Sequence, residues 1–143
     1  MSSIRERILQ RIVGVLTPVA TSFGATLHRS PSVGIPREQS PALLVFPESE
    51  SIAERANDRV TRQLVIRVVA LARGDDAEAA ADEILVAAHG ALLADANLGG
   101  LCLGIRELDC EWEMEDADMT AAAIPARYEI GYRTRFDDLS VQG

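Results

Sequence analysis

The fold is decided by residues 101–136, which read LCLGIRELDCEWEMEDADMTAAAIPARYEIGYRTRF. The first half alternates, with acids at Glu107, Asp109, Glu111, Glu113 and Glu115 and apolar side chains at Leu108, Cys110, Trp112 and Met114. The second half alternates again, with apolar or small side chains at even positions from Ile124 to Phe136. A period of two is typical of a strand with one buried face. The stretch therefore predicts two antiparallel strands joined by a turn within 116–120.

The polar faces of these two strands carry opposite charges. If the strands pair, the five acids lie beside Arg127, Arg133 and Arg135, and the other face enters the core. The apolar residues of 101–105 have the opposite parity to those that follow. A β-bulge near Arg106 is the simplest way to reconcile the two registers.

Three further strands are expected upstream. Residues 59–73 predict the central strand of a sheet, because both faces are apolar over its middle. Shorter strands are expected at 25–29 and at 42–46, the latter bounded by Pro41 and Pro47.

Two amphipathic helices accompany these strands. The first begins at a capping-box signal formed by Ser3 and Glu6, and its apolar stripe extends to Phe23. Because Pro18 lies inside this stripe, we expect a kink or an end near Thr17.

The second helix opens after Gly74 with acids in 75–83, which suit the positive end of a helix dipole. Its buried stripe comprises Ala77, Ala81, Ile84, Leu85, Ala88 and Leu92. Residues 30–40 and 48–57 show no clear periodicity. We expect the first to be a loop and the second to be a loop or a helical turn.

Together these elements predict an α+β fold. We expect a single domain over residues 1–143, with one twisted, mostly antiparallel or mixed sheet of about five strands and two main helices packed against it. A chain of 143 residues is long enough for one hydrophobic core.

The charge balance argues against a nucleic-acid or membrane-surface binder. All 14 basic residues are arginine, and against 22 acids they leave a formal net charge of −8, which repels polyanions. The chain has no apolar run of about 18 residues and no basic leader before an apolar segment. We therefore expect a soluble protein without a signal peptide, cytosolic by default, that binds no membrane.

Motifs for catalysis are absent from the sequence. It holds no P-loop, GxGxxG, GxSxG, HExxH or CxxC, and His28 and His89 lack companions at metal-ligand spacing. We interpret both histidines as packed or surface residues, and we expect no enzymatic activity, cofactor or metal. Cys102 and Cys110 would lie roughly 26 Å apart on one extended strand, which excludes a disulfide between them.

The acidic row has two interpretations. It is either a solvated strand face partly neutralised by the arginines opposite, or a subunit interface or charged channel wall. A cation site or a glycosidase pair is disfavoured, because side chains at i and i+2 stand side by side about 6.6 Å apart and not in an enclosed pair. We interpret Cys110, Trp112 and Met114 as core residues and not as a cofactor box.

The whole chain resembles the tail terminator, or tail completion, proteins of long-tailed bacteriophages and related tail-like particles, the minor tail protein U type. The likeness lies in the segments SIRERILQRIVGVL, PALLVFP and RVTRQLVIRVVALARGDDAEAAADEIL. It continues through LLADANLGGLCLGIRELDCEWEMEDAD to IPARYEIGYRTRF. The resemblance covers nearly the whole chain and rests on the order and the residue patterns of the segments, not on a catalytic motif.

The resemblance implies a structural virion protein at the head-proximal end of the tail, assembled in the host cytoplasm. The family forms a ring, typically a hexamer, on the last ring of the tail tube; the ring ends polymerisation and offers a surface to the head connector. The implied partners are further copies of the chain, the major tail tube protein and the head–tail connector. DNA would pass through the ring without specific binding.

Within this picture the charged residues suggest three surfaces, since charged pairs between subunits fix register. The candidates for the subunit interface are Arg127, Arg133, Arg135, Glu111, Glu113 and Glu115. The candidates for the ring lumen are Glu107 and Asp109, and those for a docking loop are Arg37 and Glu38.

Two other classes of function stay open on the sequence. The first is a small-ligand-binding or regulatory α+β module in the cytoplasm, which a deep apolar pocket and a stable monomer would favour. The second is an enzyme, which would need an unrecognised site around His28 or His89 with nearby acids.

Overall fold

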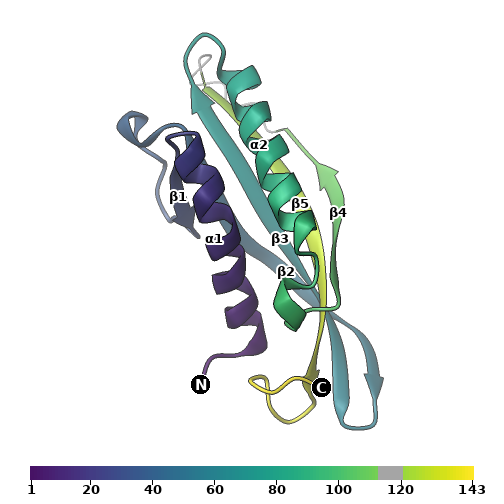
Figure 1. Cartoon of the computed structure of the whole chain (residues 1–143). Helices are drawn as coiled ribbons and strands as arrows, with labels where there is room; N and C mark the ends of the chain where they lie inside the picture. Colours follow the sequence, from purple (N-terminus) through teal and green to yellow (C-terminus); the bar gives the residue numbers. More distant parts are fainter. Residues whose placement is uncertain (113–120) are drawn as a thin grey trace.

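The computed structural model describes residues 1–112 and 121–143, apart from the side chain of Arg37. The elements follow the order α1 (Ile4–Ser22), β1 (Thr26–Arg29), η1 (Arg37–Gln39), β2 (Ala42–Ala56), β3 (Arg59–Arg73), α2 (Ala77–Ala94), η2 (Leu98–Gly100), β4 (Gly104–Cys110) and β5 (Ala121–Arg135). Figure 1 shows two long helices lying against one sheet. The predicted α+β fold is confirmed.

The sheet has the strand order β1-β2-β3-β5-β4. β1 runs parallel to β2, and every other neighbouring pair is antiparallel. β3 is the central strand, as its two apolar faces predict, and all 15 of its residues pair with β5. The sheet is therefore mixed only at the edge that β1 forms.

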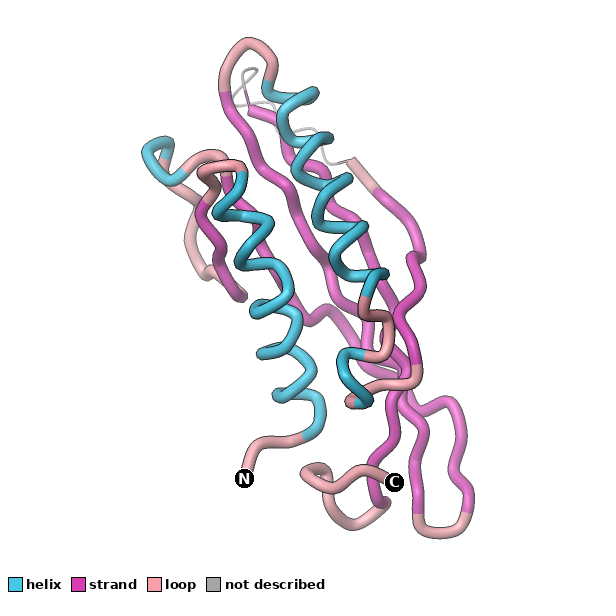
Figure 2. The backbone as a smooth tube through the Cα atoms, in the orientation of Figure 1, coloured by secondary structure: helices cyan, strands magenta, loops and turns pink. Residues whose placement is uncertain are grey.

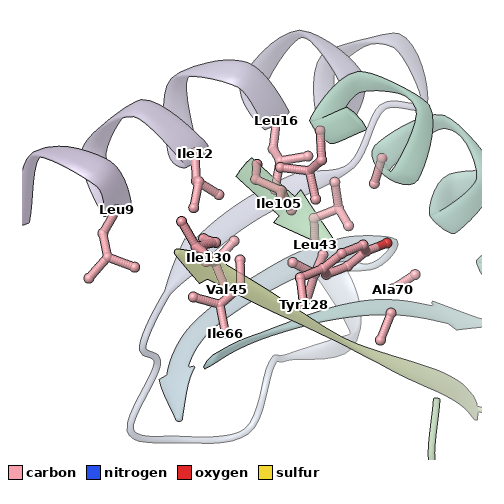
Figure 3. Packing of buried hydrophobic residues seen from close by; sticks show 14 of the residues in the cluster. Leu9, Ile12, Leu16, Leu43, Val45, Ile66, Ala70, Ile105, Tyr128 and Ile130 are labelled. Atoms are coloured by element: carbon pink, nitrogen blue, oxygen red, sulfur yellow. The ribbon is translucent and has the colours of Figure 1, made fainter. Parts of the chain in front are cut away.

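Both helices cover the same face of the sheet (Figure 2). Leu9, Ile12 and Leu16 of α1 point toward the sheet in Figure 3, where Ile12 lies next to Ile130 and Val45. The even-numbered side chains of β5 from Ile124 to Thr134 are buried on this face, as their alternation predicts. α2 contributes its predicted stripe, of which Ala77, Ala81, Ile84, Ala88 and Leu92 are buried.

The opposite face of the sheet carries neither α1 nor α2. Leu44 and Phe46 of β2 pair with Val69 and Arg67 of β3, and the odd-numbered residues of β5 continue that face. We call it the open face. Most of its side chains are only partly buried, whereas the helix-facing side chains of β3 are buried almost throughout.

α1 does not kink or end near Thr17, so that prediction is wrong. The helix continues through Pro18 to Ser22. Pro18 and Gly14 are both exposed, so the Gly14 carbonyl that lacks an N–H partner faces water. Thr17 Oγ1 donates to the Val13 carbonyl at 2.7 Å, which adds a bond within the same turn.

The segment 48–57 is neither a loop nor a helical turn, which corrects a second prediction. It forms the distal half of β2 and pairs with β3 as far as Ala56, with two register shifts. Asn57 closes the turn with a φ of 56°, a conformation that asparagine tolerates. The polar side chains suit this hairpin because it projects beyond the body of the molecule at the lower end of Figure 1.

β4 contains the bulge predicted near Arg106, but the bulge changes the position of one acid. The register shift lies between Glu107 and Asp109, so Glu107 pairs with Tyr128 and Asp109 with Arg127. These two acids therefore lie on opposite faces of the sheet, and the predicted single row of acids is wrong at its first two members.

Two aromatic side chains expected on the buried face are exposed. β4 ends at Cys110, and Trp112 beyond it is 60% exposed, so its interpretation as a core residue is wrong. Phe136 follows the end of β5 and is 63% exposed. Met114 lies outside the described residues. No helix in the part of the chain that the structure describes is long and apolar enough to cross a membrane.

Candidate interaction surface

The open face divides into a charged part and an apolar part. The charged part is centred on Arg127 of β5, whose Nη1 donates to Asp109 of β4 at 2.8 Å and whose Nε donates to Glu48 of β2 at 3.1 Å. The hydrogen bonds to Asp109 and then to Glu48 raise the pKa of the Arg127 guanidinium. One arginine thus joins strands from both sides of the central strand.

A second ion pair continues this part towards the sheet edge. Arg106 of β4 donates from Nε to Glu129 of β5 at 3.0 Å, and these two residues pair directly across the strands. The hydrogen bond to Glu129 raises the pKa of the Arg106 guanidinium. Surface pairs of this kind add little stability but define the charge pattern that a partner meets.

The candidates for the subunit interface are brought together only in part. Arg127, Arg133 and Arg135 share the open face of β5, as predicted. Arg133 donates to Thr61 Oγ1 at 3.3 Å, and Arg135 forms an exposed ion pair with Asp137 at 3.3 Å. Glu111 is exposed beyond β4. Glu113 and Glu115 lie outside the described residues, so pairing of the arginines with this acidic row stays a prediction.

Of the two lumen candidates, Asp109 lies in the charged part of the open face and Glu107 lies on the helix side. Glu107 is 3.9 Å from His89 Nδ1, which also contacts the Tyr128 hydroxyl at 2.9 Å. Burial raises the pKa of Tyr128 to about 12, so the phenol stays protonated at neutral pH. This polar group joins α2 to the sheet, and no spacing in the sequence indicates it.

The docking-loop candidates lie in the segment between β1 and β2. Arg37 and Glu38 form part of η1, and the Glu38 side chain is exposed. The loop is fastened to the central strand by Arg73, which donates to the Ile35 carbonyl at 2.7 Å and to Ser40 Oγ at 3.0 Å. It therefore has a fixed position along the apolar part of the open face.

The described residues offer few groups for covalent or metal chemistry. They contain no group of three or more His, Cys, Asp and Glu side chains arranged to hold a metal ion. His28 Nε2 contacts only a threonine hydroxyl, at 2.9 Å from Thr26. Burial raises the pKa of the Cys102 thiol to about 11 and also raises that of Cys110. Both thiols are thus protonated and weakly nucleophilic at neutral pH.

The residue that sequence reasoning misses is Arg67. It stands on the central strand between apolar neighbours, with its guanidinium carbon 4.8 Å from the ring centre of Phe46. Its Nε is buried and has no hydrogen-bond partner among the described residues. The sequence does indicate this residue, because an arginine in the apolar middle of a central strand is unusual and a buried polar atom without a partner is costly.

The fold of this chain is similar to that of a solved structure. No family model matches the chain, and no curated protein matches it. Among solved structures, it is similar to a chain in the virion of a native gene transfer agent particle, with a TM-score of 0.51 and 16% sequence identity. The match covers 90% of each chain. The two proteins therefore share a fold over nearly their whole length.

Proposed function

We propose that this protein is a structural component of a phage-like particle, and that it forms the ring that ends the tail tube. The observation that carries the proposal is the shared fold with a virion chain over 90% of both lengths. The sequence resemblance to tail terminators points to the same class of particle. In this role the ring, a homohexamer, stops tube polymerisation and presents a surface to the head connector.

The open face supplies a means of assembly. It is a fixed, partly apolar surface with a defined charge pattern, and such surfaces suit contacts between proteins. We place the lateral contact between copies along β5, with Arg133 and Arg135 meeting acids of the neighbour. In this arrangement Asp109, which Arg127 holds, belongs to the rim that the DNA passes.

The charge of the protein fits passage of DNA without binding. A net charge of −8 per copy gives the ring wall a negative field, and a negative field keeps a polyanion from adhering. The partners proposed are further copies, the major tail tube protein and the head–tail connector. The protein would be located in the virion after assembly in the host cytoplasm.

We also propose that the protein is not an enzyme. Its two thiols are protonated at neutral pH, and each histidine contacts hydroxyl groups of the fold. On the open face, Arg127 pairs with Asp109 and Glu48, and Arg106 pairs with Glu129. These are properties of a surface that positions another protein.

The test is to mix the purified protein with polymerising tail-tube subunits and to measure tube lengths by electron microscopy. The expected result is a ring at one end of each tube and a shorter tube length. Arg133→Glu should abolish the ring, whereas Arg55→Glu, the same charge change at the turn of the projecting hairpin, should leave it intact. Tubes that grow uncapped in the presence of the wild-type protein would contradict the proposed role.

A further inference from the structure

The apolar part of the open face contains a groove with about 320 Å³ of space. Its floor is formed by strands β2, β3 and β5, and the loop between β1 and β2 forms one wall. The apolar lining includes Val33, Leu44, Phe46, Val69, Leu71 and Pro125. Val33 is 77% exposed, so the wall of the groove ends in an apolar side chain that faces solvent.

The groove has a positive character. Arg67 and Arg73 line it, and no carboxylate of the described residues does. Arg73 is bound to the loop, whereas Arg67 has a buried Nε without a partner. The acids Glu48 and Asp109 on the same face are occupied by Arg127. The groove therefore suits a segment that brings an apolar side chain next to a carboxylate.

The C-terminal segment 136–141 has that chemistry. Phe136, Leu139 and Val141 are 63%, 46% and 37% exposed, and Asp137 and Asp138 lie between them. Asp137 forms an exposed ion pair with Arg135 at 3.3 Å, and Asp138 accepts from Ser140 Oγ at 2.6 Å, so both acids have only local partners. The segment is held in place, since the Ile4 amide donates to the Leu139 carbonyl at 2.8 Å and the Arg135 amide to the Val141 carbonyl at 3.0 Å. A preformed segment loses little entropy when it docks.

Segment and groove of one copy cannot meet. Pro125 lines the groove and Phe136 follows the same strand, so 11 intervening steps separate them by roughly 36 Å. Figure 1 shows β5 running from the upper end of the sheet to the C-terminal segment at the lower end. Only a second copy can place its segment in the groove.

We infer that segment 136–141 of one copy docks into the groove of the next, with Phe136 against Phe46 and Val69, and with Asp137 or Asp138 bound to Arg67. The contact joins two different surfaces, so it repeats from copy to copy, and a repeat that closes is a ring. The inference rests on the proposed ring, to which it adds the segment and the groove that connect neighbours.

The experiment measures molar mass by light scattering over a range of concentrations. The wild-type chain should associate. Arg67→Glu alone, and Asp137→Arg with Asp138→Arg in one chain, should each weaken association about thirtyfold or more. An equal mixture of the two variant proteins should restore association. In an alternating assembly, every second contact places the native acidic segment against Arg67, and the contacts between place the arginine-bearing segment in the groove that carries the Arg67→Glu change.

Two further variants distinguish the loss of the contact from misfolding of the chain. Phe136→Ala changes only an exposed side chain and should also weaken association, while Arg55→Glu should not. A wild-type chain that stays monomeric at every concentration would overturn the inference, as would a mixture that fails to recover. If copies associate through this contact but do not cap tail tubes, the inferred contact stands and the proposed role in the tail fails.

Discussion

At the scale of single residues, the ion pairs that stabilise this fold join elements far apart in the sequence. Glu50 of β2 accepts from Arg5 of α1 at 3.0 Å and lies 3.8 Å from Arg62 of β3. The buried Tyr132 hydroxyl of β5 also donates to Glu50. Burial, followed by the hydrogen bond to Glu50, raises the pKa of Tyr132. One carboxylate thus connects the first helix to three strands.

A second such pair makes stability depend on pH. Arg29 donates two hydrogen bonds to Glu6, at 2.6 and 2.7 Å, and this hydrogen bonding lowers the pKa of Glu6 below its usual 4.5. A lowered folded-state pKa stabilises the fold above pH 4.5, and that contribution is lost as the pH falls through the lower value. Arg29→Gln should therefore cost up to about 1 kcal/mol at pH 7 and almost nothing in strong acid.

The measurement is the difference in melting temperature between wild type and Arg29→Gln at neutral and acid pH. Arg55→Gln is the matched control, since Arg55 is exposed at the hairpin turn, and it should leave the melting temperature unchanged at both values. A difference for Arg29→Gln that persists unchanged in acid would mean that the arginine acts through packing and not through Glu6.

At the scale of elements, periodicity predicted the strands and helices whose side chains face the core. β3, β5 and α2 were predicted because each carries a complete apolar stripe. The distal half of β2 was missed because its side chains are polar, and its extended state is imposed by pairing with β3. The bulge in β4 was predicted near Arg106, but Glu107 and Asp109 were assigned to one face because the exact register depends on the partner strand, which a single strand does not reveal.

The interaction surface was less predictable than the elements. The arginines of β5 were placed on one face by parity alone. The groove, in contrast, combines three strands with a loop from between two others. No local pattern encodes that combination. Arg67 was visible in the sequence as a charge in an apolar run, but the sequence did not show that its face of the sheet carries neither α1 nor α2.

The continuity of α1 leads to a prediction about Pro18. A proline inside a helix removes one hydrogen bond and costs about 3 kcal/mol, and here the freed carbonyl belongs to Gly14 on the exposed side. Pro18→Ala should raise the free energy of unfolding by roughly 1–3 kcal/mol. Gly14→Ala, in the same helix and with no atom near the new methyl group, should raise it by about 1 kcal/mol.

Urea unfolding of both variants measures these changes. The larger gain should belong to Pro18→Ala, because it restores a hydrogen bond as well as helical propensity. A loss of stability on Pro18→Ala would show that the proline ring contributes packing in a contact with another molecule or with the loop that follows the helix.

At the scale of the whole molecule, the described residues form two layers, in which α1 and α2 cover one face of the sheet and leave the other open. A sheet in a self-sufficient α+β domain can leave its second face polar, but β3 also carries Val65, Val69 and Leu71 on its open face. A second face that is partly apolar, grooved and positively charged suits the contacts between copies that we propose. The apolar side chains on both faces thus predicted β3 as the central strand, although neither α1 nor α2 covers its second face.

This asymmetry predicts different outcomes for neighbouring residues of β3. Ile66 is fully buried under the helices, between Pro47 and Tyr128, whereas Val65 lies on the open face between Ser49 and Glu129. Ile66→Asn should lower the free energy of unfolding by about 3–5 kcal/mol, because it removes core packing and buries an amide. Val65→Asn should cost about 1 kcal/mol, which is the loss of β propensity.

Urea unfolding at dilute concentration, where copies are apart, measures both changes. When repeated at concentrations at which copies associate, it should show an added cost for Val65→Asn alone, because Val65 pairs with Glu129 of β5, the strand along which we propose the lateral contact. Equal losses for the two variants in dilute protein would mean that the open face is already covered within one chain, and the proposed role of that face in assembly would then fail.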